Sequence, residues 1–122
     1  MKAVRGKMAG QGYILAREQH DGKQYIVARD VHVELTEGVC CRPSGQIVKE
    51  CRKYDNDIQF SNGSMAVNGR DIMALLTLEA YHGRNLDVFV EDKEGTNAKE
   101  IAARLCSGLT TKAFDPDFEV RE

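Results

Sequence analysis

Two adjacent cysteines followed by arginine and proline are the residues of this sequence best suited to chemistry. They lie in the segment GVCCRP, residues 38–43. Proline is favoured in the first turn of a helix, so Cys40 and Cys41 should lie at a helix N-terminus. Unpaired backbone N–H groups and the positive end of the helix dipole favour an anion there. The segment therefore predicts an anion-binding or partner-binding site formed by Cys41, Arg42 and Pro43, with the pKa of the Cys40 thiol below the ~8.5 of a free thiol.

The cysteine spacing does not indicate a metal centre. The chain has four cysteines, but they form neither a CxxC motif nor a second pair at zinc-ligand spacing. A chain of this length and patterning does not need a disulfide framework. Cys51 and Cys106 fall on the apolar faces of predicted helices, where a free cysteine is a small buried side chain. We therefore expect neither a metal nor a cofactor.

Composition narrows the class of protein. The chain has 122 residues, of which 42% are hydrophobic and 30% charged, and its formal net charge is −2. This balance argues against a basic surface for nucleic acid. No apolar stretch approaches the ~20 residues of a membrane span, and the first residues lack the apolar core of a secretory signal. We expect a cytoplasmic protein that contacts neither nucleic acid nor membrane directly.

An alternating pattern near the N-terminus predicts a half-buried strand. It places these side chains on one face: Tyr25, Val27, Val31, Val33 and Leu35. Ahead of it, the pair Asp21-Gly22 suits a type I′ turn and predicts a hairpin. Residues 13–19 also suit a short helix, and the sequence leaves both interpretations open.

The later patterns predict the rest of the fold. They are a helix after Pro43, a hairpin around Asn62-Gly63, a short helix ended by Gly83, a strand over residues 86–92, and a helix capped by Asn97 and ended by Gly108. This order predicts an α+β open-faced β-sandwich, a four-stranded antiparallel sheet covered on one face by three helices. The predicted units are an N-terminal extension with a further hairpin strand (1–24), the domain (25–111) and an acidic tail (112–122).

This order and the segments GVCCRP, KYDNDIQF and VNGRDIMALLTL resemble the HPr family, the histidine-containing phosphocarrier proteins of the sugar phosphotransferase system. The resemblance runs from about Val31 to about Leu109 and implies an HPr-like fold. It also implies a histidine at a helix N-terminus that takes a phosphoryl group from enzyme I and passes it to sugar-specific A components. Cys40 stands at the position of that histidine. Asp71 stands at the position of a serine that a regulatory kinase phosphorylates, and Arg70 at that of its neighbouring lysine.

Both positions that carry phosphate in the family have therefore changed. A thiolate can carry a phosphoryl group, but enzyme I is shaped for imidazole, and positioning errors of about 1 Å can cost ~100-fold in rate. A carboxylate at Asp71 supplies about one negative charge, where phosphoserine supplies ~1.5–2. The sequence is similar to the catabolite-repression HPr relatives, although those retain the serine. It favours a regulatory module that does not relay phosphate and is not an enzyme.

The resemblance also implies a docking surface beside the helix that follows Asp71. In the family this helix presents an apolar patch to protein partners, which here would be Ile72, Met73 and Leu76, while Leu75 should pack in the core. The expected partners are phosphotransferase components or a transcriptional regulator. The predicted N-terminal hairpin adds an exposed sheet edge, and such edges pair with other chains, so a homodimer is a further expectation.

Two other functions stay open from the residues. In the first, Cys40 itself is the phosphoacceptor of a phosphocarrier. In the second, Cys40 is the thiol of a redox sensor. Vicinal cysteines close a strained ring, so oxidation would then favour a sulfenic acid, a mixed disulfide or a dimer. His20, His32 and His82 are interpreted as surface residues, His82 at the end of a helix.

Overall fold

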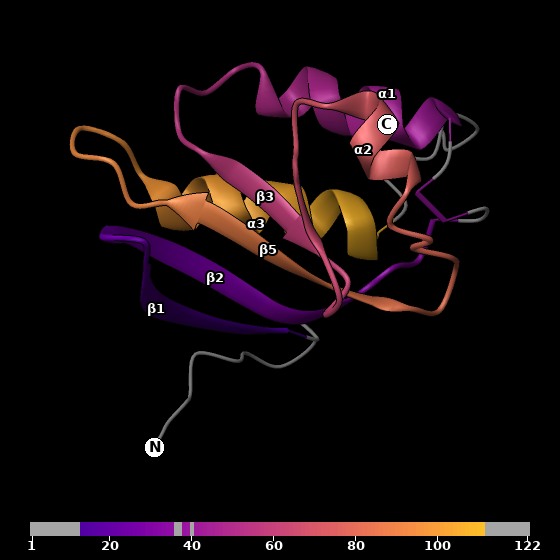
Figure 1. Ribbon diagram of the computed structural model, residues 1–122, viewed down its shortest axis with the longest axis horizontal. Helices are drawn as coiled ribbons and strands as arrows, with labels where there is room; N and C mark the ends of the chain where they lie inside the picture. Colours follow the sequence, from indigo (N-terminus) through magenta and orange to yellow (C-terminus); the bar gives the residue numbers. More distant parts are fainter. Residues whose placement is uncertain (1–12, 36–37, 40, 112–122) are drawn as a thin grey trace, which may run out of the picture.

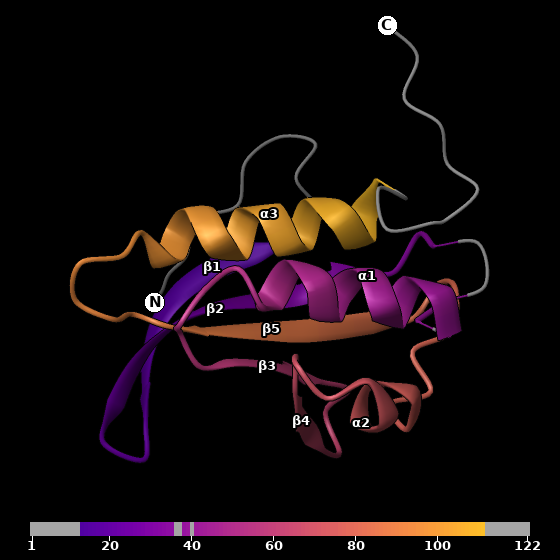
Figure 2. The same ribbon diagram turned by 90° about the horizontal axis from the view of Figure 1, so that it is seen from above.

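The computed structural model describes residues 13–35, 38–39 and 41–111, except the side chains of Ile14 and Cys41. Its elements are β1 (Ile14–His20), β2 (Lys23–His32), α1 (Cys41–Cys51), β3 (Ile58–Ser61), β4 (Ala66–Asn68), α2 (Ile72–Leu76), β5 (Asn85–Glu91) and α3 (Ala98–Thr110). The strands form one antiparallel sheet in the order β1-β2-β5-β3-β4. Helix α3 packs against β2 and β5, α1 runs beside α3, and α2 packs against α1 (Figures 1 and 2). None of the helices described has the length and apolar character to cross a membrane.

The N-terminal hairpin is present, and residues 14–20 form a strand rather than a helix. Its turn has φ of 52° at Asp21 and 79° at Gly22, the two left-handed residues that a type I′ turn requires. His20 and Lys23 form the closing pair of the hairpin. The sheet therefore has five strands rather than four. The fifth is β1, which lies in the predicted N-terminal extension.

The predicted alternation in β2 is wrong for its first half, because the strand contains a β-bulge. The pairing with β5 shifts register between Ala28 and Val31, and Asp30 takes a left-handed conformation with φ of 60°. One extra residue moves every side chain on one side of the bulge to the opposite face. Val31 thus shares the helix-covered core with Ile26 and Ala28. Tyr25 and Val27, although buried, lie on the other face of the sheet.

The core lies between the sheet and the helices and takes side chains from every layer. Its largest fully buried members include Leu35, Ile47, Ile58, Phe60, Leu75, Leu86 and Leu105. Cys51 and Cys106 are fully buried, as predicted. Burial raises the pKa of each of these thiols to about 12. Both therefore stay uncharged at neutral pH and serve as packing residues.

Two helix ends differ from their predictions. Helix α2 was expected to continue to Gly83 but ends at Leu76. The hydroxyl of Thr77 donates to the Ala74 carbonyl at 2.6 Å, and Glu79 has a φ of 53°, so the chain cannot continue the helix. Helix α3 does not stop at Gly108, which is buried within it, and continues to Thr110. Gly108 therefore does not act as a stop signal.

Strand β1 lies at one edge of the sheet and is seven residues long. Its pairing with a second copy of the chain stays a prediction, tested by the mass of the protein in solution. We expect a dimer for the full chain and a monomer after removal of residues 1–22, with the helix content of the domain retained. A monomer in both cases would contradict the prediction.

Candidate functional site

The first turn of α1 lies where the sequence predicted it. The helix begins at Cys41, and its second and third residues are Arg42, which is exposed, and Pro43, which is buried. Cys40 and the side chain of Cys41 lie outside the described residues. Figures 1 and 2 place this first turn at the same end of the molecule as α2. Of the predicted anion site, the structure thus describes the exposed guanidinium of Arg42 at the start of α1.

The segment that leads to Cys40 is fixed against the segment that follows α2. Val39 donates its backbone N–H to the Ala80 carbonyl at 2.9 Å. The ring of His82 donates through Nδ1 to the Leu35 carbonyl at 3.1 Å. His82 therefore does not end a helix as predicted, but holds two loops together. Gly38 lies where these two loops meet and has a φ of 72°. A Cβ at this residue would collide with the Ala80 carbonyl oxygen.

Asp71 caps α2, as an aspartate before a short helix predicts. Its carboxylate accepts a hydrogen bond from the backbone N–H of Ala74 at 3.1 Å, and the side chain is exposed. Arg70 lies beside it in sequence but points elsewhere. Its guanidinium donates to the carbonyl of Asn56 at 2.8 Å and to that of Tyr54. The structure therefore gives Arg70 a structural role in holding the loop after α1, while the Asp71 side chain caps α2 at the surface.

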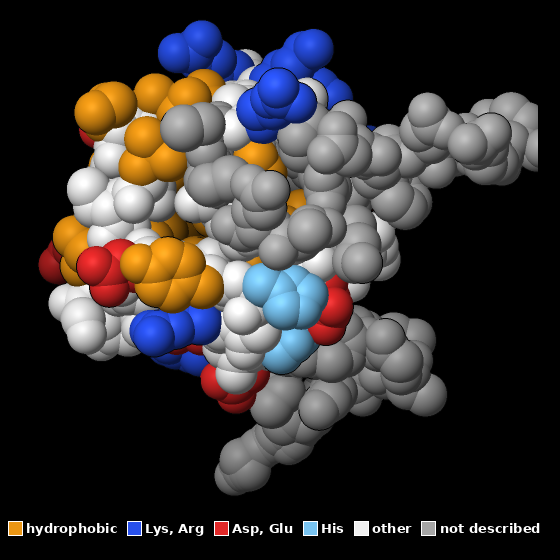
Figure 3. All heavy atoms as spheres, turned by 90° about the vertical axis from the view of Figure 1, so that its right-hand side faces the viewer, with side chains coloured by type: hydrophobic (Ala, Val, Ile, Leu, Met, Phe, Trp, Pro, Cys, Tyr) orange, Lys and Arg blue, Asp and Glu red, His pale blue; other side chains and the backbone are white. Residues whose placement is uncertain are grey.

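Helix α2 and its surroundings carry an exposed apolar patch. Ile72 is 40% exposed and Met73 69% exposed, while Leu75 is fully buried and Leu76 half-buried. The loop after α2 adds Tyr81, which is 54% exposed. Figure 3 views the molecule from this end and shows hydrophobic side chains gathered on the left of the view. We call Ile72, Met73 and Tyr81 the apolar patch.

Tyr81 was not found from the sequence. The guanidinium of Arg84 lies over its ring, 5.3 Å from the centroid, in a cation–π contact. The sequence signal was ambiguous, because a tyrosine two residues before a glycine fits a helix end as well as a surface loop. The chain reversal after Leu76 and the left-handed Glu79 turn this side chain outward.

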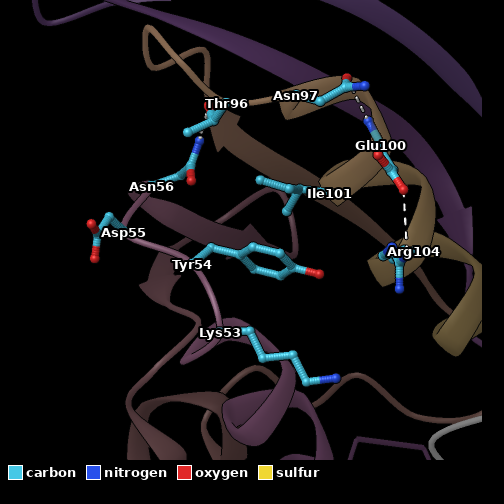
Figure 4. Close-up of a pocket in the computed structure, with 9 residues that line it drawn as sticks. All are labelled: Lys53, Tyr54, Asp55, Asn56, Thr96, Asn97, Glu100, Ile101 and Arg104. Atoms are coloured by element: carbon cyan, nitrogen blue, oxygen red, sulfur yellow. Dashed lines mark hydrogen bonds and ion pairs between the residues drawn. The ribbon is translucent and has the colours of Figure 1, made fainter.

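A hollow of about 480 Å³ opens between the end of α1 and the start of α3 (Figure 4). Its lining is Lys53, Tyr54, Asp55, Asn56, Thr96, Asn97, Glu100, Ile101 and Arg104. Asn97 caps α3 by accepting from the backbone N–H of Glu100 at 3.2 Å, and Glu100 pairs with Arg104. The hollow lies beyond the C-terminal end of α1, whereas Arg42 lies at its start. It is therefore separate from the predicted anion site.

Comparison with known proteins assigns the family. The model of the family described as "PTS HPr component phosphorylation site" matches residues 27–110. The chain belongs to the HPr family. HPr proteins are phosphocarriers of the phosphotransferase system rather than catalytic enzymes. The match leaves β1 outside the family segment.

Individual relatives agree with this assignment. The phosphocarrier protein HPr of Treponema pallidum is 29% identical over 80 residues, which cover 66% of this chain and 91% of that protein. The HPr-like protein Crh of Halalkalibacterium halodurans is 27% identical over 75 residues, 62% of this chain and 89% of that protein. The crystal structure of HPr from Bacillus anthracis superposes with a TM-score of 0.62 at 25% identity, covering 70% of this chain and 96% of that one. The predicted HPr resemblance and α+β fold are confirmed.

Proposed function

We propose that this HPr family member is a regulatory protein-binding module that does not relay phosphate, similar to Crh. The observation that carries the proposal is the cysteine at residue 40, where the sequence resemblance puts the phosphoacceptor histidine, while Arg42 and Pro43 are kept. The similarity to an HPr-like protein named Crh supports it. Asp71 places a carboxylate where the family gains negative charge only after a kinase phosphorylates a serine. This supports a regulatory state that needs no kinase.

We propose that one surface binds the partner, made of Arg42, Asp71, Ile72, Met73 and Leu76. Arg42 and Asp71 are exposed and of opposite charge, and the patch beside them is apolar. Such a mixture of charged and apolar groups suits a transient protein partner better than a small-molecule pocket. The partner is a phosphotransferase component or a transcriptional regulator.

The charge of Asp71 can be separated from its capping role. Asp71→Ala removes both and should cost about 1 kcal/mol of stability through the lost cap. Asp71→Asn keeps a capping oxygen and removes only the charge. In an affinity pull-down, we expect both variants to lose the partners of the native protein.

The matched control is Asn97→Ala, which removes the corresponding cap from α3 without altering the proposed surface. It should lower the stability by a similar amount and leave the partners unchanged. An Asp71→Asn variant that retains every partner would remove the charge of Asp71 from the proposal.

A phosphocarrier that uses Cys40 is the second candidate. The description of the matching family model, a phosphorylation site, and the exposed guanidinium of Arg42 at the start of α1 favour it.

A thiol redox sensor is the third candidate function. Burial and raised pKa values make Cys51 and Cys106 unreactive, so thiol chemistry would fall to Cys40 and Cys41. The pH dependence of Cys40 alkylation tests this, since an ordinary thiol pKa would end the sensor hypothesis.

A further inference from the structure

The strand that lies outside the family match creates a groove on the helix-bearing face of the sheet. Helix α3 packs against β2 and β5, and β1 extends the sheet beyond them (Figure 1). A hollow of about 290 Å³ lies there, lined by Leu15, Ala16, Arg17, Ile26 and Lys99. Leu15 is partly buried and gives the groove an apolar floor, while Ile26 lies beneath it with 2% of its surface exposed.

The rim of this groove carries two basic side chains, one of them without an ion-pair partner among the described residues. Arg17 and Lys99 are both exposed. Arg17 pairs with Asp92, which is the acidic group facing it. Among the described residues, Lys99 has no ion-pair partner. The groove therefore fits a segment that combines an apolar side chain with carboxylates.

We propose that the acidic segment 112–122 of the same chain occupies this groove. Its sequence KAFDPDFEVRE places Phe118 between Asp117 and Glu119. The ring of Phe118 would cover the exposed part of Leu15, and the flanking carboxylates would lie near Lys99. This inference goes beyond the proposed function and uses none of the residues of the partner surface.

The chain length allows this placement. From Thr111 back to Lys99 the distance along α3 is roughly 18 Å, at about 1.5 Å of rise per residue. An extended chain spans up to about 3.4 Å per residue, so the seven residues from Thr111 to Phe118 reach roughly 24 Å. Phe114, with three residues, reaches only about 10 Å. Phe118 is therefore the aromatic residue that can arrive at the groove.

Charge argues against the other end of the chain as the occupant. Residues 1–12 directly precede the start of the described structure, but they carry Lys2, Arg5 and Lys7 and no acidic residue. Like charges would then meet at the rim formed by Arg17 and Lys99. The acidic C-terminal segment meets opposite charge there instead.

Zero-length carbodiimide cross-linking of the full chain tests the proposal directly, because it joins a lysine amine only to a carboxylate in contact with it. We expect a cross-link between Lys99 and Asp117 or Glu119 whose yield does not depend on protein concentration, since tethering gives an effective concentration in the millimolar range. Raising the salt concentration should lower the yield. Lys49, exposed on α1, serves as the control amine. Cross-links from the segment to Lys49 as frequent as those to Lys99 would overturn the proposal.

Amide chemical shifts give a second readout in the full chain. The variant with Asp117→Asn, Phe118→Ser and Glu119→Gln should shift the amides of Leu15, Arg17, Ile26 and Lys99. The variant Lys99→Glu should shift the amides of Leu15 and Ile26, whereas Lys49→Glu should not. Shifts confined to the last turn of α3 would overturn the proposal. Cross-links between isotopically heavy and light chains would also overturn it, by assigning the groove to the segment of a second copy.

Discussion

Replacing Gly38 with alanine should destabilise the fold by about 3 kcal/mol. The left-handed conformation at φ of 72° costs a non-glycine residue roughly 1–2 kcal/mol. The new Cβ would also collide with the Ala80 carbonyl oxygen and lie 2.8 Å from the Cα of Tyr81. Backbone atoms cannot rotate away as a side chain can, so the two loops must separate, which adds roughly 1–3 kcal/mol. Urea unfolding of the two proteins measures the difference.

The matched control is Gly83→Ala. Gly83 also has a positive φ, 91°, but a Cβ there would meet nothing within 4 Å. We expect this variant to lose only the conformational part, about 1 kcal/mol. If the two variants lost the same stability, the close packing of the loop before Cys40 on the loop after α2 would be contradicted.

Replacing Met73 with glutamate should slow phosphoryl transfer from enzyme I at least ~10-fold in a chain that also carries Cys40→His. Met73 is 69% exposed, so its replacement should cost the fold little. A hot-spot residue near the centre of a docking surface contributes more than about 1.4 kcal/mol, which is tenfold in affinity, and we place Met73 there. The initial rate of labelling by enzyme I and phosphoenolpyruvate measures the effect.

The control for this variant is Gln24→Glu, which adds the same carboxylate at an exposed site on β2. It should leave the labelling rate of the Cys40→His chain unchanged. An equal rate for Met73→Glu and Gln24→Glu would remove Met73 from the docking surface. A Cys40→His chain that takes no label at all would contradict the proposal that this surface is intact.

Local signals in the sequence were enough to predict the helix caps and the hairpin turn. Asp71 and Asn97 each accept a hydrogen bond from the backbone N–H three residues ahead, because capping involves only neighbouring residues. Asp21-Gly22 likewise forms the type I′ turn on its own conformational preferences. Pro43 placed Cys40 and Arg42 at a helix start, and the helical pattern after Asp71 placed that residue at another; the structure describes Arg42 and Asp71 there.

Features that depend on pairing between distant segments could not be predicted in the same way. The bulge in β2 is defined by its register against β5, and in the alternation of residues 25–35 only the charged Arg29 breaks the apolar face beside it. The close approach of Gly38 to Ala80 joins segments about forty residues apart in sequence, so a glycine there resembled any loop glycine. Tyr81 became part of the apolar patch only because the left-handed Glu79 ends the local helical turn.

The central claim is that this HPr family member does not relay phosphate from enzyme I. Its most direct test is incubation of the native chain with enzyme I and radiolabelled phosphoenolpyruvate, with the Cys40→His variant in parallel. The native chain should stay unlabelled while Cys40→His takes up an acid-labile label, because only the nucleophile has been lost. Rapid labelling of the native chain at Cys40 would contradict the regulatory assignment and identify a phosphocarrier that uses a thiol.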